Sequence, residues 1–104
     1  MTDITYAPEV LDAKKNGAPI VALESTIITH GMPWPRNYET ALQVEEAVRT
    51  NGATPATMAV LEGRRHVGLT EGALDTLAQA KDVAKLSRAE LATCVATGGT
   101  GATT

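Results

Sequence analysis

The amino-acid sequence predicts an α/β fold in layers, with a mixed sheet in which some strands are parallel. Two continuous apolar runs, at residues 19–23 and 56–61, are typical of strands in such sheets. Segments with helical spacing separate and follow these runs, most clearly at residues 36–51. The resulting order is helix, strand, helix, strand–turn–strand, helix, helix, and this alternation favours an α/β layer architecture.

The first part of the chain predicts a helix and then a strand. Residues 4–17 have a weak apolar side, and Pro8 fits the first helical turn, where a missing N–H costs little. Gly17 is suited to end this helix. Residues 19–23 then predict a strand that is covered on both faces. The prolines within residues 31–35 exclude a regular element there, because each fixes its own φ angle and restricts the preceding residue.

The strongest helix signal covers residues 36–51. Ala41, Val44 and Val48 recur at helical spacing and predict the buried face of this helix. Asn37 lies near the start, where an asparagine side chain can cap the helix. Gly52 follows as a stop signal.

A hairpin and two capped helices are predicted in the second half of the chain. Thr70 precedes a helix at residues 71–80, and Ser87 with Glu90 forms a capping box for a shorter helix. We expect the glycine- and threonine-rich segment 97–104 to be a flexible end. The hairpin consists of a strand at 56–61, a turn at 62–64 and a strand at 65–68.

The length suits one small domain or a piece of a larger one. The chain has 104 residues, and two or three short strands make a poor sheet, because stable sheets usually carry about 4–6. Its sequence stops in a glycine-rich segment of the kind that leads into another element. We therefore expect residues 1–104 to be the N-terminal part of a single domain, truncated in the Gly/Thr-rich segment.

Composition and charge exclude several classes of function. The net charge is −3 with no basic stripe, so we expect no nucleic-acid partner. Cys94 is the single cysteine, which excludes an internal disulfide and fits a reducing compartment. No run approaches the roughly 18 apolar residues of a membrane span, and the start does not resemble a signal peptide. We expect a cytoplasmic protein without a membrane partner.

Glu24 is the best candidate for a chemical role, because it lies where an apolar run passes into a polar, irregular loop. Such strand ends are where α/β proteins place reactive groups. Leu23, Ile27 and Ile28 would shelter the carboxyl group, which disfavours its charged form and makes it a usable general acid. Two alternatives stay open: a surface glutamate, and a carboxylate that caps neighbouring backbone N–H groups.

Other side chains carry weaker signals. His30 fits an acid, a base or a metal ligand, but a hydrogen bond that orders the loop is favoured. We interpret His66 as structural, and the histidines and the cysteine lack the spacing of a zinc site. Lys85, just before the capped helix, could help backbone N–H groups to hold a phosphate, or it could be a solvated loop lysine. The glycines of residues 97–104 match neither nucleotide-binding motif, although such loops can cradle anions.

Residues 22–33, with the sequence ALESTIITHGMP, resemble the signature of a known family. Further blocks match this family in the same order, at residues 39–41, 44–46, 52–57, 67–70, 85–88 and 101–104. On these residues the chain is similar to the pseudouridine-5′-phosphate glycosidases, also called the indigoidine-synthase-A-like family.

The resemblance implies a cytoplasmic α/β/α enzyme, typically a homotrimer, that uses a divalent metal such as manganese. The family reversibly splits the C–C glycosidic bond of pseudouridine 5′-phosphate into uracil and ribose 5-phosphate. Its proton-donating glutamate maps onto Glu24, and its lysine that contacts the sugar phosphate maps onto Lys85. The chemistry agrees, because the departing uracil needs a proton delivered to carbon and an anionic substrate needs a fixed cation.

Family members are much longer than this chain. Their nucleophilic lysine, which forms a Schiff base with the opened sugar, and their metal-ligand aspartate lie further along, so no metal ligand is assigned here. We expect a small-molecule substrate and a homo-oligomer for the full-length protein. Three hypotheses stay open: the N-terminal part of the enzyme, a non-catalytic interaction module that packs against full-length subunits, and a piece that binds sugar phosphate through Lys85 and the tail.

Overall fold

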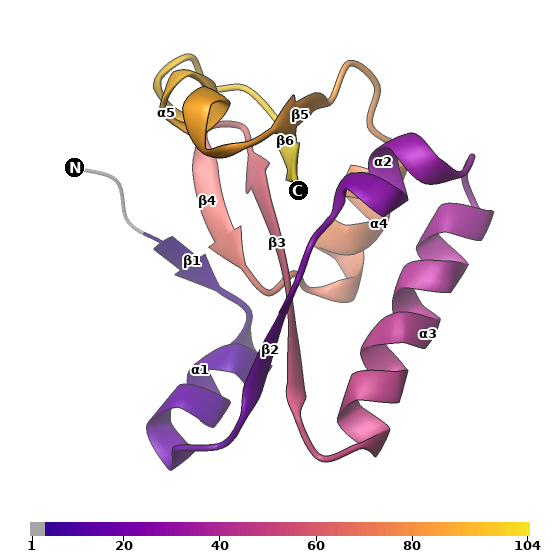
Figure 1. Ribbon diagram of the computed structural model, residues 1–104, viewed down its shortest axis with the longest axis vertical. Coiled ribbons are helices and arrows are strands. Elements are labelled where there is room, and N and C mark those ends of the chain that lie inside the picture. Colours follow the sequence, from indigo (N-terminus) through magenta and orange to yellow (C-terminus); the bar gives the residue numbers. More distant parts are fainter. Residues whose placement is uncertain (1–3) are drawn as a thin grey trace.

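In residues 4–104, which a computed structural model describes, six strands form a mixed sheet and five helices cover it (Figure 1). The strand order is β1-β4-β3-β6-β5, and β2 also pairs with β3, so the predicted α/β class with a mixed sheet is confirmed. The elements are β1 (Ile4–Tyr6), α1 (Pro8–Asn16), β2 (Ile20–Leu23), α2 (Thr26–Gly31), α3 (Arg36–Thr50), β3 (Thr54–Leu61), β4 (Arg64–Val67), α4 (Glu71–Gln79), β5 (Ala84–Leu86), α5 (Arg88–Ala96) and β6 (Gly101–Thr103).

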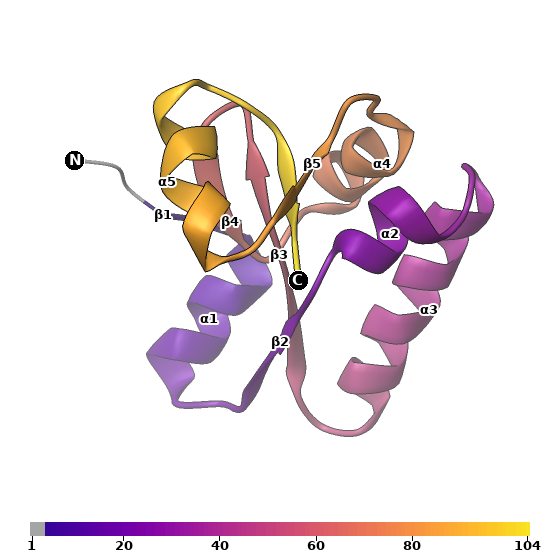
Figure 2. The same cartoon turned by 45° about the horizontal axis from the view of Figure 1, so that its top comes forward.

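Strand β3 is the centre of the sheet, because three other strands pair with it. β2 runs parallel to its first half, from Ile20 opposite Thr54 to Leu23 opposite Thr57. β4 and β6 run antiparallel to its second half. Because β2 is parallel and β6 antiparallel to the same strand, their carboxyl-terminal ends point towards each other along β3 (Figure 2).

Alternate side chains of β3 pack against different helix layers, as the period of two in a strand requires. Ala56 packs with α1, and Val60 packs with α5, whereas Ala59 packs with side chains from α2, α3 and α4. Helices α1 and α5 therefore lie on one face of the sheet, and α2, α3 and α4 lie on the other (Figure 1). This is the expected α/β/α layering.

The predicted first helix is wrong at its start. Ile4–Tyr6 forms β1, which pairs in parallel with β4, and only Pro8–Asn16 is helical. The partner strand lies far along the chain, so local sequence could not indicate it. Pro8 does occupy the first turn, and Gly17 ends the helix in the left-handed region with φ 65°.

The segment 19–31 departs from prediction in two ways. β2 is not buried on both faces, because Ile20 and Val21 are 37% and 40% exposed. Within the described part of the chain β2 pairs only with β3, which leaves its other edge uncovered. Residues 26–31, expected to begin an irregular loop, instead form the short helix α2, whose last residue is Gly31.

Helix α3 forms where predicted, but the predictions of its N-cap and of its buried face are wrong. Asn37 lies inside the helix, is 2% exposed, and its side-chain amide donates to the carbonyls of Ile28 at 2.9 Å and Ala78 at 2.8 Å. It thereby joins α2, α3 and α4 instead of capping α3. Ala41 is buried as expected, but Val44 is exposed and Glu45 is buried in its place.

The hairpin and both later helix caps are confirmed. Glu62 and Gly63 have φ values of 48° and 81°, the positive angles that a tight two-residue hairpin turn requires, and β4 begins at Arg64. The Thr70 hydroxyl accepts the Ala73 N–H at 3.1 Å. The Glu90 carboxylate accepts the Ser87 N–H at 2.8 Å in the capping box of α5.

Strands β5 and β6 were not predicted, and the tail is not a flexible end. β6 lies between β3 and β5, and its Ala102 is fully buried. Gly101 packs so tightly on Leu86 that an added Cβ would overlap that side chain. Three-residue strands are too short to show a period, which is why the sequence did not reveal them. No helix in residues 4–104 is long and apolar enough to cross a membrane.

Candidate functional site

The ends of β2 and β6 meet at the carbonyl group of Met58 on β3. The Ser25 hydroxyl donates to this carbonyl at 2.6 Å, and the Thr103 hydroxyl donates to it at 2.9 Å. The Thr103 N–H donates to Ser25 Oγ at 2.9 Å, and the Ser25 N–H donates to the Thr103 carbonyl at 3.0 Å. The Thr26 hydroxyl also donates to that carbonyl at 2.9 Å. We call Ser25, Thr26, Met58 and Thr103 the strand junction.

Hydroxyl side chains suit this junction because each supplies one donor and two acceptor lone pairs. Backbone groups at the ends of two opposed strands lose their ladder partners, and buried unpaired groups are costly. Ser25 is fully buried, and its hydroxyl both donates and accepts there. The junction therefore fixes the residue before it, Glu24, relative to β3 and β6.

Glu24 lies at the rim of a mostly apolar cavity of about 230 Å³ between β2, α2 and α3. Leu23, Ile27 and Ile28, the expected neighbours, all line this cavity. The residue is nevertheless exposed, so the expectation that its carboxyl group is sheltered is wrong for this chain. Its Oε2 accepts the Thr26 N–H at 3.0 Å, which is the backbone-capping contact that one alternative described. Glu24 therefore lies at the rim of the cavity and also makes a local hydrogen bond.

Lys85 is exposed and lies in β5, not in a loop as the alternative interpretation held. In the parallel pairing of β5 with β6, Lys85 is opposite Ala102 and Leu86 is opposite Thr103. Because Ser25 bonds to Thr103 from the other side, the segments that carry Glu24 and Lys85 flank the end of β6. Within residues 4–104 the structure gives no hydrogen bond or ion pair between the two side chains.

The remaining candidates do not form a second site. His30 is exposed on α2, and its Nδ1 shares a 2.6 Å hydrogen bond with the Thr29 hydroxyl. His66 is half-buried in β4, where burial, and then the charge of Arg64, lower its pKa. Burial raises the pKa of the Cys94 thiol. Gly101 and Ala102 are buried in β6, so they cannot form the anion-cradling loop of the third hypothesis.

The residues described do not fit the divalent metal that the resemblance implies. A metal site of this kind needs several carboxylate, imidazole or thiolate ligands around one point. Among residues 4–104 no three histidine, cysteine, aspartate or glutamate side chains lie close enough together to hold an ion. No chemical step through a metal is therefore assigned to this chain.

Sequence reasoning missed the side chains that build the site. Ser25, Thr26 and Thr103 are recognisable in the sequence as polar residues, but their partners, the carbonyls of Met58 on β3 and of Thr103 on β6, are not. A buried contact between Glu45 and Thr57, beside the same cavity, was also missed. The only available signal was the presence of a glutamate within an apolar helical stripe.

Fold and site together define an α/β/α protein with an acidic residue at a strand end beside an apolar cavity. A model of the family described as indigoidine synthase A like protein matches residues 9–104, and the chain belongs to this family. The resemblance seen in the sequence is thereby confirmed.

Named relatives and solved structures agree with this membership. The chain is 62% identical, over 101 residues, to the pseudouridine-5′-phosphate glycosidases of Jannaschia sp. and of Roseobacter denitrificans. The match covers 97% of this chain but only 33% of each relative, so this chain spans about a third of the relatives' length. A crystal structure of the prealnumycin C-glycosynthase in complex with ribulose 5-phosphate is 38% identical, with a TM-score of 0.83 over 97% of this chain and 32% of that one. An indigoidine synthase A-like protein from Thermotoga maritima also gives a TM-score of 0.83, at 27% identity over 99% of this chain and 33% of that one.

The strand junction predicts that Ser25→Ala destabilises the chain by about 1–3 kcal/mol, because it removes the buried acceptor of the Thr103 N–H. Thr76→Ala is the matched control, since its exposed hydroxyl bonds within α4, and it should change stability by less than about 0.5 kcal/mol. Urea unfolding followed by circular dichroism measures both. Equal stability of Ser25→Ala and the native chain would contradict the junction.

Proposed function

We propose that this chain supplies the proton donor and a phosphate-binding lysine of an enzyme that reversibly cleaves the C–C glycosidic bond of pseudouridine 5′-phosphate. Relatives at 62% identity carry the name of that enzyme. A structural neighbour named as a C-glycosynthase was solved with a sugar phosphate. The observation that carries the proposal is the strand junction, which fixes the Glu24 segment beside the cavity and next to β6.

Glu24 is the proposed acid. When the C–C bond breaks, its electron pair stays on the uracil carbon, and a proton from the carboxyl group takes the place of the sugar there. Oε2 of Glu24 already accepts the Thr26 N–H, which orients the group and leaves Oε1 to carry the proton. In the reverse direction the same carboxylate takes the proton back.

Lys85 is the proposed partner of the sugar phosphate. It lies in β5, next to the end of β6 and two residues before Ser87, the N-cap of α5. A fixed cation suits a phosphate dianion. The nucleophilic lysine that takes up the opened sugar is proposed for the part of the longer relatives that this chain does not match.

The complete reaction is proposed for a protein of the relatives' length. The divalent metal, expected to be manganese, would be bound outside residues 4–104, because these residues offer no ligand cluster. The homotrimer and the cytoplasmic location implied by the resemblance belong to the same proposal, and the single, unpaired Cys94 fits that compartment.

The proposal predicts that Glu24→Gln abolishes catalysis when this chain replaces the matching first third of the Jannaschia protein. Release of uracil from pseudouridine 5′-phosphate should fall by at least about 10²-fold, because the amide cannot donate the proton. Lys85→Met should mainly raise KM.

Glu39→Gln, an exposed change in the first turn of α3, is the matched control and should retain activity. Full activity of Glu24→Gln would remove Glu24 from the mechanism. An inactive graft with native residues in a folded protein would reject the proposed reaction for this chain.

A second candidate function, a non-catalytic interaction module, rests on exposed apolar side chains. Ile20, Val21, Ile27 and Val44 are between 37% and 55% exposed and surround the free edge of β2 and the cavity. Such an edge can pair with another strand, and such a patch marks a contact surface. The proposed partner is a full-length subunit of the same family.

This second function predicts that the chain binds the full-length Jannaschia protein in a mass measurement by light scattering. Val21→Lys should weaken the complex, because it places a charge on the edge strand. Leu11→Glu changes a similarly exposed side chain on α1, which is not part of the β2 edge or the cavity lining, and should leave binding intact. A mixture in which both proteins keep their separate masses would count against the module.

A further inference from the structure

Glu45 is buried where α3 faces the sheet, at 4% exposure, while its neighbour Val44 is 46% exposed. Burying an ionised carboxylate costs free energy unless it is paired and fully hydrogen-bonded. A helix that had only to pack on β3 would present an apolar side chain here. A position that breaks the local pattern in this way is where a functional constraint is expected.

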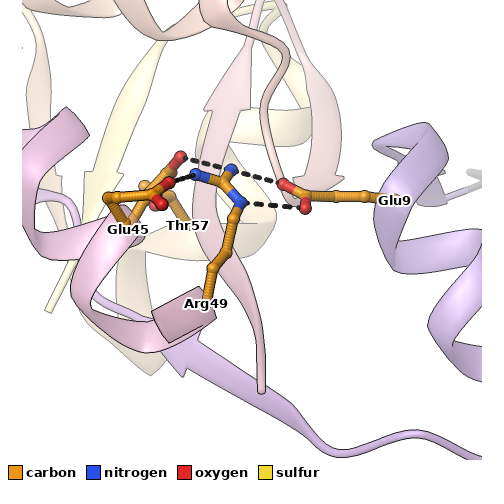
Figure 3. Close-up of polar contacts among 5 residues, drawn as sticks. Glu9, Glu45, Arg49 and Thr57 are labelled. Atoms are coloured by element: carbon orange, nitrogen blue, oxygen red, sulfur yellow. Dashed lines mark hydrogen bonds and ion pairs between the residues drawn. The ribbon is translucent and has the colours of Figure 1, made fainter. Parts of the chain in front are cut away.

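The contacts of Glu45 link three elements (Figure 3). Its Oε2 accepts the hydroxyl of Thr57 on β3 at 2.6 Å, and its Oε1 accepts Nη2 of Arg49 at 3.3 Å. Arg49 is held in turn by Glu9 of α1, at 3.1 Å through Nε and at 2.6 Å through Nη2. The hydrogen bonds that Arg49 donates to Glu9 raise the pKa of Arg49, so a cationic guanidinium lies beside the buried Glu45.

Thr57 connects this chain of contacts to the site. It is 2% exposed, lies opposite Leu23 in the β2–β3 register, and lines the same cavity as Glu24. Its hydroxyl has one proton, which the contact with Glu45 uses, so any ligand group that reaches its oxygen has to be a donor. Glu45 thereby sets both the rotamer and the hydrogen-bonding polarity of a side chain in the cavity wall.

We propose that Glu45 is a positioning residue: through Thr57 it fixes the cavity wall opposite Leu23 and so the placement of Glu24. Arg49, which also donates to Glu9, donates a hydrogen bond to the Glu45 carboxyl group. The inference rests on the proposed function only in that Glu24 is the acid whose placement matters. The geometric part, from Glu45 through Thr57 to Leu23 and Glu24, is tested on the chain itself.

Glu46 provides a matched control on the same helix. Its carboxylate also contacts Arg49, at 3.3 Å through Nη1, but its side chain is 69% exposed and has no contact with Thr57 among the interactions described. Glu45→Gln and Glu46→Gln each replace a carboxyl group that contacts Arg49 with an amide. Only the first changes the acceptor of the Thr57 hydroxyl.

The first arm of the test compares amide NMR spectra of the 104-residue chain. Glu45→Gln should shift the resonances of Thr57, Leu23 and Glu24, whereas Glu46→Gln should leave Leu23 and Glu24 in place. Thr57→Val should reproduce the shifts, and Thr57→Ser, which keeps the hydroxyl, should restore the native positions. If Glu45→Gln does not fold, the two Thr57 variants decide the question. Unmoved Leu23 and Glu24 resonances in Thr57→Val would overturn the proposal.

The second arm measures kinetics in the graft on the Jannaschia protein. Glu45→Gln should lower kcat for uracil release on the order of 10-fold with little change in KM, because misplacement of the acid affects the chemical step. The double variant Glu45→Gln/Thr57→Val should be no slower than either single one. Additive losses would overturn the positioning role. An inactive native graft would reject the proposed reaction alone, since the spectra still decide the positioning.

Discussion

One carbonyl group on β3, that of Met58, determines how the two halves of this chain meet. β2 and β6 run towards each other along β3, so neither strand can extend past the other. The backbone groups at both ends need partners, and the hydroxyls of Ser25, Thr26 and Thr103 supply them. A segment from the start of the chain and one from its end are thereby bonded to each other and to the central strand. The position of Glu24 follows from this arrangement.

The same arrangement separates the two residues of the proposed chemistry. Glu24 lies on the β2 side of the meeting point, beside an apolar cavity, and Lys85 lies on the β5 side, before the capped helix α5. In the proposed reaction, a proton donor near apolar side chains suits the departing base, and a fixed cation suits the phosphate. The buried Glu45 accepts the hydroxyl of Thr57, which lines the cavity from β3.

Local patterns predicted what local physics decides. The span of α3, the Thr70 and Ser87 caps and the hairpin turn follow from spacing and cap chemistry, and all were confirmed. Strands β1, β5 and β6 were missed, because three residues show no period and their partners lie far along the chain. Asn37 was misread and the burial of Glu45 was missed for a related reason: each side chain makes its hydrogen bonds with another element, which helical spacing cannot reveal. Glu24 was found from its place at a strand end, whereas Lys85 emerged chiefly from the family resemblance.

Native-state hydrogen exchange at two amides tests most directly whether the strand ends are joined. The Ser25 and Thr103 N–H groups donate to each other's residues, so opening the junction exposes both at once. The account predicts that these two amides exchange together and as slowly as that of Val60 in β3, although Thr103 is next to the chain end. A Thr103 amide that exchanges at the rate of an unstructured peptide, while Val60 stays protected, would contradict it.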